Sequence, residues 1–354
     1  MAARNTSWRI YGANGYTGRL VAQEAARRGL KPLLAGRNEA EVRELADSLG
    51  LDWVTFPLDD APRLEQALAG QRLVLHCAGP FSATAGPMLR ACLARHVHYL
   101  DITGEIAVFE QAHALAEDAR RADVVLLPGV GFDVVPSDCL AASLVEDLPA
   151  ATYLQLAFKA GGGPSPGTAK TSVEGLARGG CVRRDGRLQS VPLAWKRRRV
   201  PFADGECSAV TIPWGDVFTA WVSTGVPDIE VYMAVPDATI ARLRRLRWLQ
   251  PLLGLGTIQR FLKKRIEGRV TGPSDARREA TRSELWGEVS SADGRRAAAT
   301  MTTPNGYDLT VTAALGIVQY LLENDVEGGY YTPSLLMGSG YAASLPGVSV
   351  RPAD

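Results

Sequence analysis

The sequence has no marked excess of charge, no patterned cysteines and few histidines. Lysine and arginine number 39 against 38 aspartate and glutamate residues, so the chain has no overall attraction for nucleic acid and we expect no such partner. The five cysteines are odd in number and scattered, without a C-x-x-C pair or a histidine at zinc-ligand spacing. We therefore expect neither a disulfide framework nor a metal site.

The chain also lacks the signals of secretion and of membrane insertion. Its N-terminus reaches glycine-rich sequence without an apolar stretch of signal-peptide length. The most apolar late segment, residues 248–258, contains one proline and two glycines and is well short of the roughly 20 residues that cross a bilayer. We expect a cytoplasmic protein.

From Ser7 to Asp147 the sequence alternates short apolar runs with amphipathic stretches, which indicates repeated βαβ units around a parallel sheet. The expected strands are Trp8–Tyr11, Lys31–Ala35, Asp52–Phe56, Leu73–Cys77, Tyr99–Ile102 and Val124–Leu127. The expected helices, each followed by a glycine suited to a left-handed cap, are Gly15–Arg28, Glu39–Leu49 and Ala61–Ala69. The fold class is α/β, with a Rossmann-type domain over residues 1–147.

After Asp147 the strand-like runs lack helices of matching length between them, which predicts a second, mixed α/β domain with a largely antiparallel sheet over residues 148–305. These runs are Thr152–Lys159, Val182–Arg184, Leu188–Val191, Ala209–Pro213, Ile229–Val235, Trp286–Val289 and Arg296–Thr302. Helices are expected over Thr168–Arg178, over a long basic segment from Asp237 to about Arg265, and over Leu309–Asn324.

A glycine-rich turn follows the first strand and opens a helix, which is the context of a dinucleotide fingerprint. Gly12 permits the tight turn, Gly15 lets backbone amides approach a pyrophosphate, and Gly18 lets the helix pack on the strand. The alternative is a purely structural turn. The residues expected to hold the cofactor here are Gly12, Asn14, Gly15, Tyr16, Thr17 and Gly18.

The end of the second strand indicates which dinucleotide binds. It carries Arg37 where an acidic residue would hold the ribose 2′-hydroxyl of NAD, so we expect NADP (NADPH), with the guanidinium on the 2′-phosphate. Otherwise Arg37 is the solvated start of the next helix. Asp59 suits the adenine amino group, or else caps the helix that begins at Ala61. Small residues after the fourth strand let a dinucleotide cross the sheet edge, which adds Ala78, Gly79, Pro80 and Phe81.

Several motifs together resemble the saccharopine dehydrogenase-like family, and within it the trans-acting enoyl reductases. They are GANGYTG from Gly12, LAGRN, LHCAGPF, YLDITGE and GVGFDVVPSD from Gly129, followed by SPGT, IPWGD, TGVP, TPNGY and YTP. The resemblance spans nearly the whole chain. It implies NAD(P)-dependent redox chemistry and a C-terminal part, residues 306–354, that packs back toward the nucleotide domain.

The leading functional hypothesis is an NADPH-dependent oxidoreductase, expected to be a homodimer, that delivers hydride to a polarised C=C bond of a hydrophobic acyl or polyketide-like substrate, free or carrier-bound. No Tyr-x-x-x-Lys pair of the short-chain dehydrogenases occurs. One alternative is a saccharopine dehydrogenase-like reductase of C=N bonds. The other is a non-catalytic NADP-binding protein associated with a membrane or a partner.

The candidate catalytic residues are Asp133, Lys170 and Tyr307. Asp133 follows the sixth strand at the carboxyl edge of the sheet, where it faces the nicotinamide or, alternatively, only fixes the Phe132–Pro136 turn. Lys170, near the start of a helix, is a candidate to protonate or orient a carbonyl. The residues expected to contact substrate are Phe132, Thr168, Trp214 and Asp216.

Two basic runs suggest further contacts. Residues 242–265 interleave eight arginines and lysines with leucine, tryptophan, isoleucine and phenylalanine, which suits a peripheral contact with an anionic membrane. The alternative is a helical pair with solvated arginines and an apolar face packed on the domain. The run Lys196–Arg199 either docks a phosphopantetheine carrier or coenzyme A, or is a solvated loop.

Overall fold

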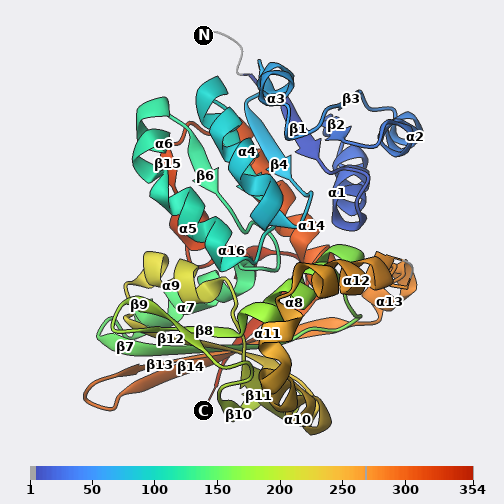
Figure 1. The fold of residues 1–354 in the computed structure, drawn as a ribbon. Helices are drawn as coiled ribbons and strands as arrows, with labels where there is room; N and C mark the ends of the chain where they lie inside the picture. Colours follow the sequence, from blue (N-terminus) through green and yellow to red (C-terminus); the bar gives the residue numbers. More distant parts are fainter. Residues whose placement is uncertain (1–4, 268, 354) are drawn as a thin grey trace. The chain divides into compact units, whose positions relative to one another are not determined.

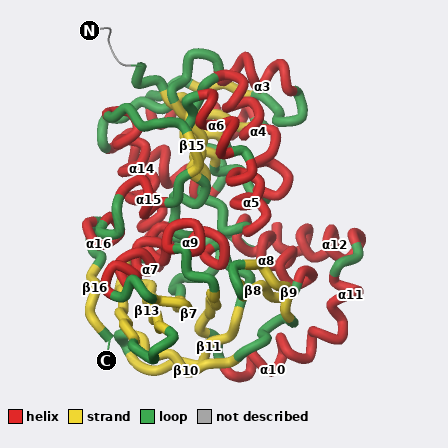
Figure 2. Tube along the Cα trace, turned by 90° about the vertical axis from the view of Figure 1, so that its left-hand side faces the viewer, coloured by secondary structure: helices red, strands yellow, loops and turns green. Residues whose placement is uncertain are grey.

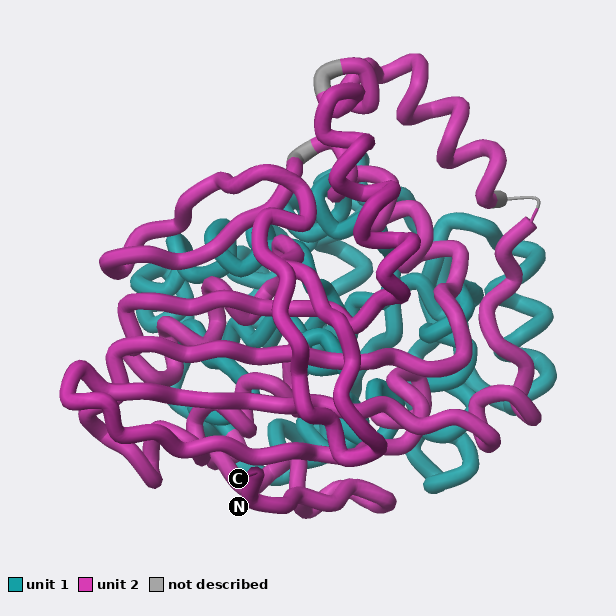
Figure 3. The backbone as a smooth tube through the Cα atoms, turned by 90° about the horizontal axis from the view of Figure 1, so that it is seen from below, with its two compact units in different colours: residues 1–133, 310–336 teal, residues 134–309, 337–354 magenta. Residues whose placement is uncertain are grey.

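The chain forms two compact units in a computed structural model that describes residues 5–267 and 269–353, apart from the side chains of Arg178, Pro251 and Glu267. Unit 1 contains residues 1–133 and 310–336, and unit 2 contains residues 134–309 and 337–354 (Figure 3). The first four residues of the expected N-terminal domain lie outside the described residues. The division falls at 133 rather than 147, and of the expected C-terminal part 310–336 join unit 1.

Unit 1 is built on a seven-stranded parallel sheet in the order β15-β6-β5-β4-β1-β2-β3 (Figure 1). Its strands are β1 (Trp8–Tyr11), β2 (Leu33–Gly36), β3 (Trp53–Thr55), β4 (Leu73–His76), β5 (His98–Asp101), β6 (Val125–Leu127) and β15 (Gly329–Tyr330). Every neighbouring pair is parallel, which confirms the Rossmann-type sheet. The sequence did not predict β15, which has two residues.

Helices cover the two faces of this sheet. They are α1 (Tyr16–Arg27), α2 (Glu39–Leu49), α3 (Ala61–Leu68), α4 (Phe81–Arg95), α5 (Ile106–Ala114), α6 (Ala116–Ala122), α14 (Gly306–Glu323) and α15 (Pro333–Met337). Residues of α3 to α6 share one buried core with β1, β2 and β4 to β6. Figure 1 shows α4 in front of the sheet and α14 behind it.

Unit 2 is built on a nine-stranded sheet that is mostly antiparallel, as the sequence predicted, with one parallel pair between β7 and β12. Its strands are β7 (Ala151–Lys159), β8 (Gly180–Arg184), β9 (Arg187–Val191), β10 (Arg197–Phe202), β11 (Gly205–Thr211), β12 (Asp228–Ala234), β13 (Arg282–Ser291), β14 (Arg296–Pro304) and β16 (Ser349–Pro352). A β-carbon on Gly287 of β13 would lie 2.8 Å from a methyl of Leu144, so the glycine lets the first helix of this unit pack closely.

The helices of unit 2 are α7 (Val135–Asp147), α8 (Pro166–Arg178), α9 (Asp216–Thr224), α10 (Asp237–Leu246), α11 (Gln250–Leu253), α12 (Gly256–Glu267), α13 (Asp275–Glu279) and α16 (Tyr341–Ser344), with a 3₁₀ turn η1 (Arg247–Leu249). The long basic helix expected from Asp237 is therefore broken into pieces (Figure 2). A proline at 251 has no N–H for a continuous helical ladder, and glycines at 254 and 256 disfavour helix.

The basic run Lys196–Arg199 is not a loop, and that interpretation is wrong. Residues Arg197–Phe202 form strand β10, which pairs with β11 in antiparallel register. Each of the four cations of the run has a carboxylate partner. The pairs are Lys196 with Glu230, Arg197 with Asp237, Arg198 with Glu288 and Arg199 with Glu206. The strand alternation and these ion pairs account for the run without a bound carrier.

Glu230 of β12 is the buried centre of a polar cluster in unit 2. Its carboxylate pairs with Arg184 and with Lys196, whose Nζ lies 2.5 Å away, and accepts hydrogen bonds from the hydroxyls of Tyr153 and Tyr232. Burial alone would raise the pKa of Glu230, but the donors and the nearby cations outweigh it and lower the pKa. Glu230 is therefore ionised and fully compensated at neutral pH.

Replacing Glu230 by glutamine should destabilise the protein, because Arg184 and Lys196 would lose the buried charge that balances them. We expect a loss of about 3 kcal/mol in unfolding free energy at neutral pH, the usual cost of breaking a buried pair. Since the folded pKa is lowered, the contribution is present above the unfolded pKa and lost as pH falls through the folded value. Urea unfolding at neutral and acid pH measures both.

The control is Glu206→Gln, which removes the carboxylate of the exposed pair with Arg199. An exposed ion pair contributes less than about 1 kcal/mol, so this variant should unfold almost as the natural protein does. Equal effects of the two substitutions would contradict the role assigned to Glu230.

Candidate functional site

The turn between β1 and α1 is shaped for close backbone approach. Gly12 has φ +81°, and a β-carbon there would lie 2.7 Å from the backbone nitrogen of Ala78. A β-carbon on Gly18 would lie 2.2 Å from the carbonyl oxygen of Gly12. Only glycine fits at both positions, so the turn is pressed against α1 on one side and against the end of β4 on the other.

The N-terminus of α1 has no side-chain cap. Gly15 is the N-cap residue, its position offers no side-chain hydrogen bond, and the first turn has no acidic residue. Tyr16 and Thr17 in this turn are half-buried, while Asn14 donates to Glu41 Oε2 at 2.8 Å and so ties the turn to α2. Free backbone amides at a helix N-terminus favour an anion such as a pyrophosphate.

Arg37 is exposed at the carboxyl end of β2, and no ion pair or hydrogen bond engages its guanidinium within the described part of the chain. It does not begin α2, because Asn38 is the N-cap and accepts from the amide of Glu41. Arg37 and Asp59 both lie near enough to Tyr11 to act on its hydroxyl, whose pKa burial raises to about 12. The lone guanidinium therefore stands beside the glycine turn.

Asp59 does not cap α3. Asp60 does so, accepting from the amide of Arg63 at 3.2 Å, so the capping alternative for Asp59 is wrong. Asp59 is exposed and has no recorded hydrogen bond to a described residue. Its carboxylate is left available to accept from an amino group.

The segment after β4 is held by a residue that follows the neighbouring strand β5. Gly79 is exposed, Ala78 and Pro80 are half-buried and Phe81 is buried at the start of α4. The amides of Phe81 and Ser82 each donate to the carboxylate of Glu105 at 2.9 Å. The N-terminus of α4 is therefore already occupied by a carboxylate, whereas the N-cap of α1 has no side-chain hydrogen bond.

Asp101, at the end of β5, joins the loops of this edge. Its buried carboxylate accepts from the hydroxyl of Tyr99 at 2.6 Å and from the amides of Thr103 and Gly129 at 2.9 Å. Burial raises the pKa of Asp101 to about 6, against the opposing effect of these donors. The amide of Val130 also donates to the Asp101 carbonyl at 2.7 Å, so β5 fixes the start of the 129–133 loop.

Asp133 ends that loop, and its carboxylate lies against Gly104. A β-carbon on Gly104 would lie 2.9 Å from Asp133 Oδ2, so the space for this carboxylate depends on the glycine. The loop is also held by Thr310, whose hydroxyl accepts from the amide of Phe132 at 2.9 Å. Asp133 is half-buried and accepts no recorded hydrogen bond from a described residue, and burial raises its pKa to about 7.

The remaining candidates lie in unit 2. Tyr307 and Thr168 come together, with their hydroxyls 3.2 Å apart, and the Tyr307 hydroxyl accepts from the amide of Ser165 at 2.5 Å. Lys170 is half-buried two residues along α8 from Thr168. Trp214 packs its ring on Phe158 with 4.5 Å between centroids.

Asp216 differs from the other expected substrate residues because it has no exposed surface. It lies in the first turn of α9, next to the N-cap position. In this structure its carboxylate does not reach solvent.

Sequence reasoning did not single out Asp101, Glu105 or Thr310 as site residues. The spacing Asp101-x-Thr103-x-Glu105 carried a signal, because each of the first two side chains accepts from the amide two residues on, as turn-forming residues do. The contact of Thr310 with Phe132 spans 178 residues of sequence and has no local signal.

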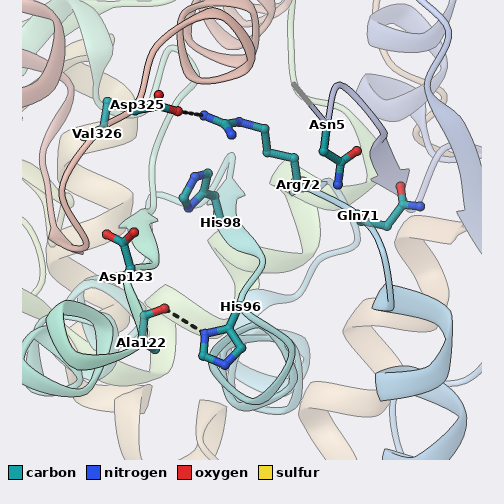
Figure 4. Close-up of a pocket in the computed structure, with 9 residues that line it drawn as sticks. All are labelled: Asn5, Gln71, Arg72, His96, His98, Ala122, Asp123, Asp325 and Val326. Atoms are coloured by element: carbon teal, nitrogen blue, oxygen red, sulfur yellow. Dashed lines mark hydrogen bonds and ion pairs between the residues drawn. The ribbon is translucent and has the colours of Figure 1, made fainter. Parts of the chain in front are cut away.

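A pocket of about 380 Å³ opens in unit 1, at the amino ends of β4, β5 and β6 and so at the opposite edge of the sheet from the glycine turn (Figure 4). Arg72 donates there to the carbonyls of Leu321 and Asn324 and pairs with Asp325. His98 Nδ1 accepts from the amide of Val125 at 3.0 Å. These contacts tie the end of α14 to the sheet, which gives the polar lining a structural role.

Across residues 5–267 and 269–353, no group of three or more histidine, cysteine, aspartate or glutamate side chains is arranged to hold a metal ion. In the same ranges no helix combines the length and the apolar character needed to cross a bilayer.

The stability of the Asp133→Asn variant should differ from that of the natural protein in a pH-dependent way. An unfolded aspartate titrates near pH ~4, whereas burial raises the pKa of Asp133 to about 7. The folded natural protein therefore loses stability as pH rises through this window, and asparagine does not. The stability difference in favour of the variant should grow from pH ~4 to ~7 and then stay constant, as urea titrations at a series of pH values would show.

Asp47→Asn, at an exposed position of α2, is the control and should show no such trend. A stability difference between Asp133→Asn and the natural protein that is the same at every pH would mean that the Asp133 carboxyl titrates normally.

Comparison with known proteins agrees with this geometry. Residues 8–127 match the family model described as "Saccharopine dehydrogenase NADP binding domain". A trans-acting enoyl reductase of Mycobacterium ulcerans is 32% identical over 140 residues, 36% of this chain and 33% of that protein. A saccharopine dehydrogenase-like oxidoreductase of Mus musculus is 27% identical over 149 residues, 36% of this chain and 35% of that protein.

The matched part spans less than half the length of these curated relatives. Apo saccharopine dehydrogenase (L-Glu forming) from Saccharomyces cerevisiae superposes with a TM-score of 0.67 at 11% identity, covering 99% of this chain and all of that chain, which shows a shared fold. Residues 8–127 are thus similar to the NADP-binding domain of saccharopine dehydrogenases, and the chain shares the fold of a saccharopine dehydrogenase.

Proposed function

We propose that this protein is an NADPH-dependent reductase that transfers hydride to a polarised C=C bond of a hydrophobic acyl substrate. The observation that carries the proposal is the exposed guanidinium of Arg37 beside the open N-terminus of α1. The similarity of residues 8–127 to an NADP-binding domain supports redox chemistry. The mycobacterial relatives, named trans-acting enoyl reductases, support the enoyl class over imines.

The residues present fit NADP. Gly12 and Gly18 let the turn pack closely on the end of β4 and on α1, and the N-cap position of α1, Gly15, has no side-chain hydrogen bond where a pyrophosphate would bind. Arg37 has five N–H donors for a 2′-phosphate, and Asp59 accepts from the adenine amino group. Bound NADPH supplies the hydride.

Asp133 is proposed to hold the proton that completes the reduction. Its raised pKa, about 7, keeps a large fraction of the carboxyl protonated at neutral pH, as a general acid requires. The carboxyl is fixed by Gly104 beneath it and by the loop that Asp101 and Thr310 hold. A protonated carboxyl in a desolvated position donates a proton to a carbanion or enolate with little reorganisation.

Arg37→Ala should abolish the preference for NADPH over NADH. The guanidinium would contact the 2′-phosphate, which NADH lacks, and a charge-assisted bidentate contact contributes roughly 1.5–3 kcal/mol. We expect NADPH to bind about 10- to 100-fold more weakly and NADH to bind as before, in fluorescence titrations at fixed salt.

Arg43→Ala is the matched control, since Arg43 is an exposed arginine on α2 that pairs only weakly with Asp47 at 3.6 Å. It should leave both affinities unchanged. If the natural chain binds neither nucleotide, the glycine turn is structural and the reductase proposal fails.

Asp133→Asn should bind NADPH normally and reduce an enoyl thioester at least 100-fold more slowly, the usual contribution of a general acid. In the natural protein kcat should fall as pH rises above about 7, because Asp133 loses its proton, and the variant should lose this dependence. Steady-state NADPH oxidation with an enoyl thioester measures both.

The same assay, run with an amine plus a carbonyl compound, separates the C=C from the C=N class. Turnover with the amine mixture alone would replace the enoyl proposal by imine reduction. Tight NADPH binding without turnover on either substrate class would indicate a non-catalytic nucleotide-binding protein.

A further inference from the structure

The segment of helices α10 to α12 in unit 2 exposes apolar side chains that a folded chain normally buries. Seven large hydrophobic side chains of the described residues are strongly exposed, and five of them lie within residues 248–261. Trp248 is 89% exposed and Phe261 62% exposed. The five are Trp248, Leu249, Leu252, Leu255 and Phe261, and we refer to them as the apolar patch. Such clustering indicates a surface that meets something apolar.

The inner side of this segment is fixed by polar side chains. Arg247 donates to the carbonyls of Leu193 and Ala194 at 2.6 Å. Gln250 donates to the carbonyl of Ala177, and Gln259 to that of Val173. Lys263 pairs with Glu174 of α8. The polar residues thus hold the segment to unit 2, which keeps the apolar patch turned outward.

Cations border the apolar patch, and no acidic residue accompanies them between Asp237 and Glu267. None of the exposed cations beside the patch forms an ion pair with a described residue. They are Arg242, Arg244, Arg245, Arg260, Lys264 and Arg265. A surface with unpaired positive charge around exposed tryptophan, leucine and phenylalanine is complementary to an anionic lipid surface.

The strand run Lys196–Arg199 is a contrasting basic run of the same unit. There all four basic side chains have carboxylate partners. The exposed cations of α10 and α12 differ from that run in having no carboxylate partner among the described residues. An apolar partner protein would not require this density of unpaired positive charge.

We propose that residues 242–265 dock the protein onto the surface of an anionic phospholipid membrane. Trp248, Leu252 and Phe261 enter the boundary between headgroups and acyl chains, and the surrounding arginines and lysines contact lipid phosphates. The segment lies on the membrane and does not cross it, since each of its helices is short. This inference is independent of the reaction that the protein catalyses.

Co-sedimentation of the full chain with lipid vesicles tests the docking. The chain should pellet with vesicles of phosphatidylcholine plus phosphatidylserine, bind vesicles of phosphatidylcholine alone much more weakly, and dissociate as salt is added. Arg244→Ser with Arg245→Ser should weaken partition roughly fivefold per arginine, corresponding to about 1 kcal/mol each. Trp248→Ser with Phe261→Ser should weaken partition at least tenfold, because each substitution removes a large apolar side chain that the membrane would bury.

The matched controls are Leu335→Ser, an exposed leucine of unit 1, and Arg199→Ser, an exposed but paired arginine. Both should pellet as the natural chain does. Failure to pellet with anionic vesicles, or partition that the patch substitutions leave unchanged, would overturn the proposal. So would an oligomer in vesicle-free solution that Trp248→Ser with Phe261→Ser dissociates, because a second copy would then cover the patch.

Discussion

The loops at the carboxyl edge of the first sheet are held by two carboxylates of this chain that accept hydrogen bonds from backbone amides. Glu105 takes the first two amides of α4, and Asp101 takes amides of Thr103 and Gly129. Both carboxylates come from one short segment at the end of β5. Because buried amides must be paired, this segment fixes two loops at once, whereas the N-cap of α1 receives no side-chain hydrogen bond and is the anion site that we propose.

The same segment explains why Asp133 can occupy an environment that raises its pKa. A carboxyl without hydrogen-bond donors is costly to ionise away from water. The loop would relax toward solvent unless something held it, and Asp101, Phe109 and Thr310 do so: a β-carbon on Gly129 would lie 2.8 Å from the Phe109 ring. The hydrogen bonds that Asp101 accepts thus hold the loop in a position where the carboxyl of Asp133 has no hydrogen-bond donor among the described residues.

Much of the fold was readable from the sequence, because local patterns determine it. The strand Trp8–Tyr11 and the helix Glu39–Leu49 have the expected bounds, since apolar runs, an asparagine N-cap and a glycine at the C-terminus mark them. Strand β15 was missed because two residues carry no periodicity and their pairing with β6 bridges about 200 residues. The sequence did not show that Asp60 rather than Asp59 caps α3, because both residues are aspartates directly before the helix.

The site was readable only where its chemistry is local. Gly12, Gly18 and Arg37 were expected because their roles follow from position relative to a strand end. Only the bond of Asp101 to the Thr103 amide follows a local spacing, whereas its bond to Gly129 and the bond of Thr310 to Phe132 are long-range and have no local signal.

The segment 242–265 shows how helix breakers interrupt an amphipathic pattern. In α10 the pattern is kept, because Ile240 is buried and Leu243 packs against the core of unit 2 while the arginines are exposed. The proline at 251 and the glycines at 254 and 256 end the continuous helix and produce three short helices, and large apolar side chains from Trp248 onward are exposed. Backbone carbonyls of unit 2 then bind Arg247, Gln250 and Gln259 on the inner side. Short helices gain little from their own ladder, so these side-chain contacts decide which face turns inward.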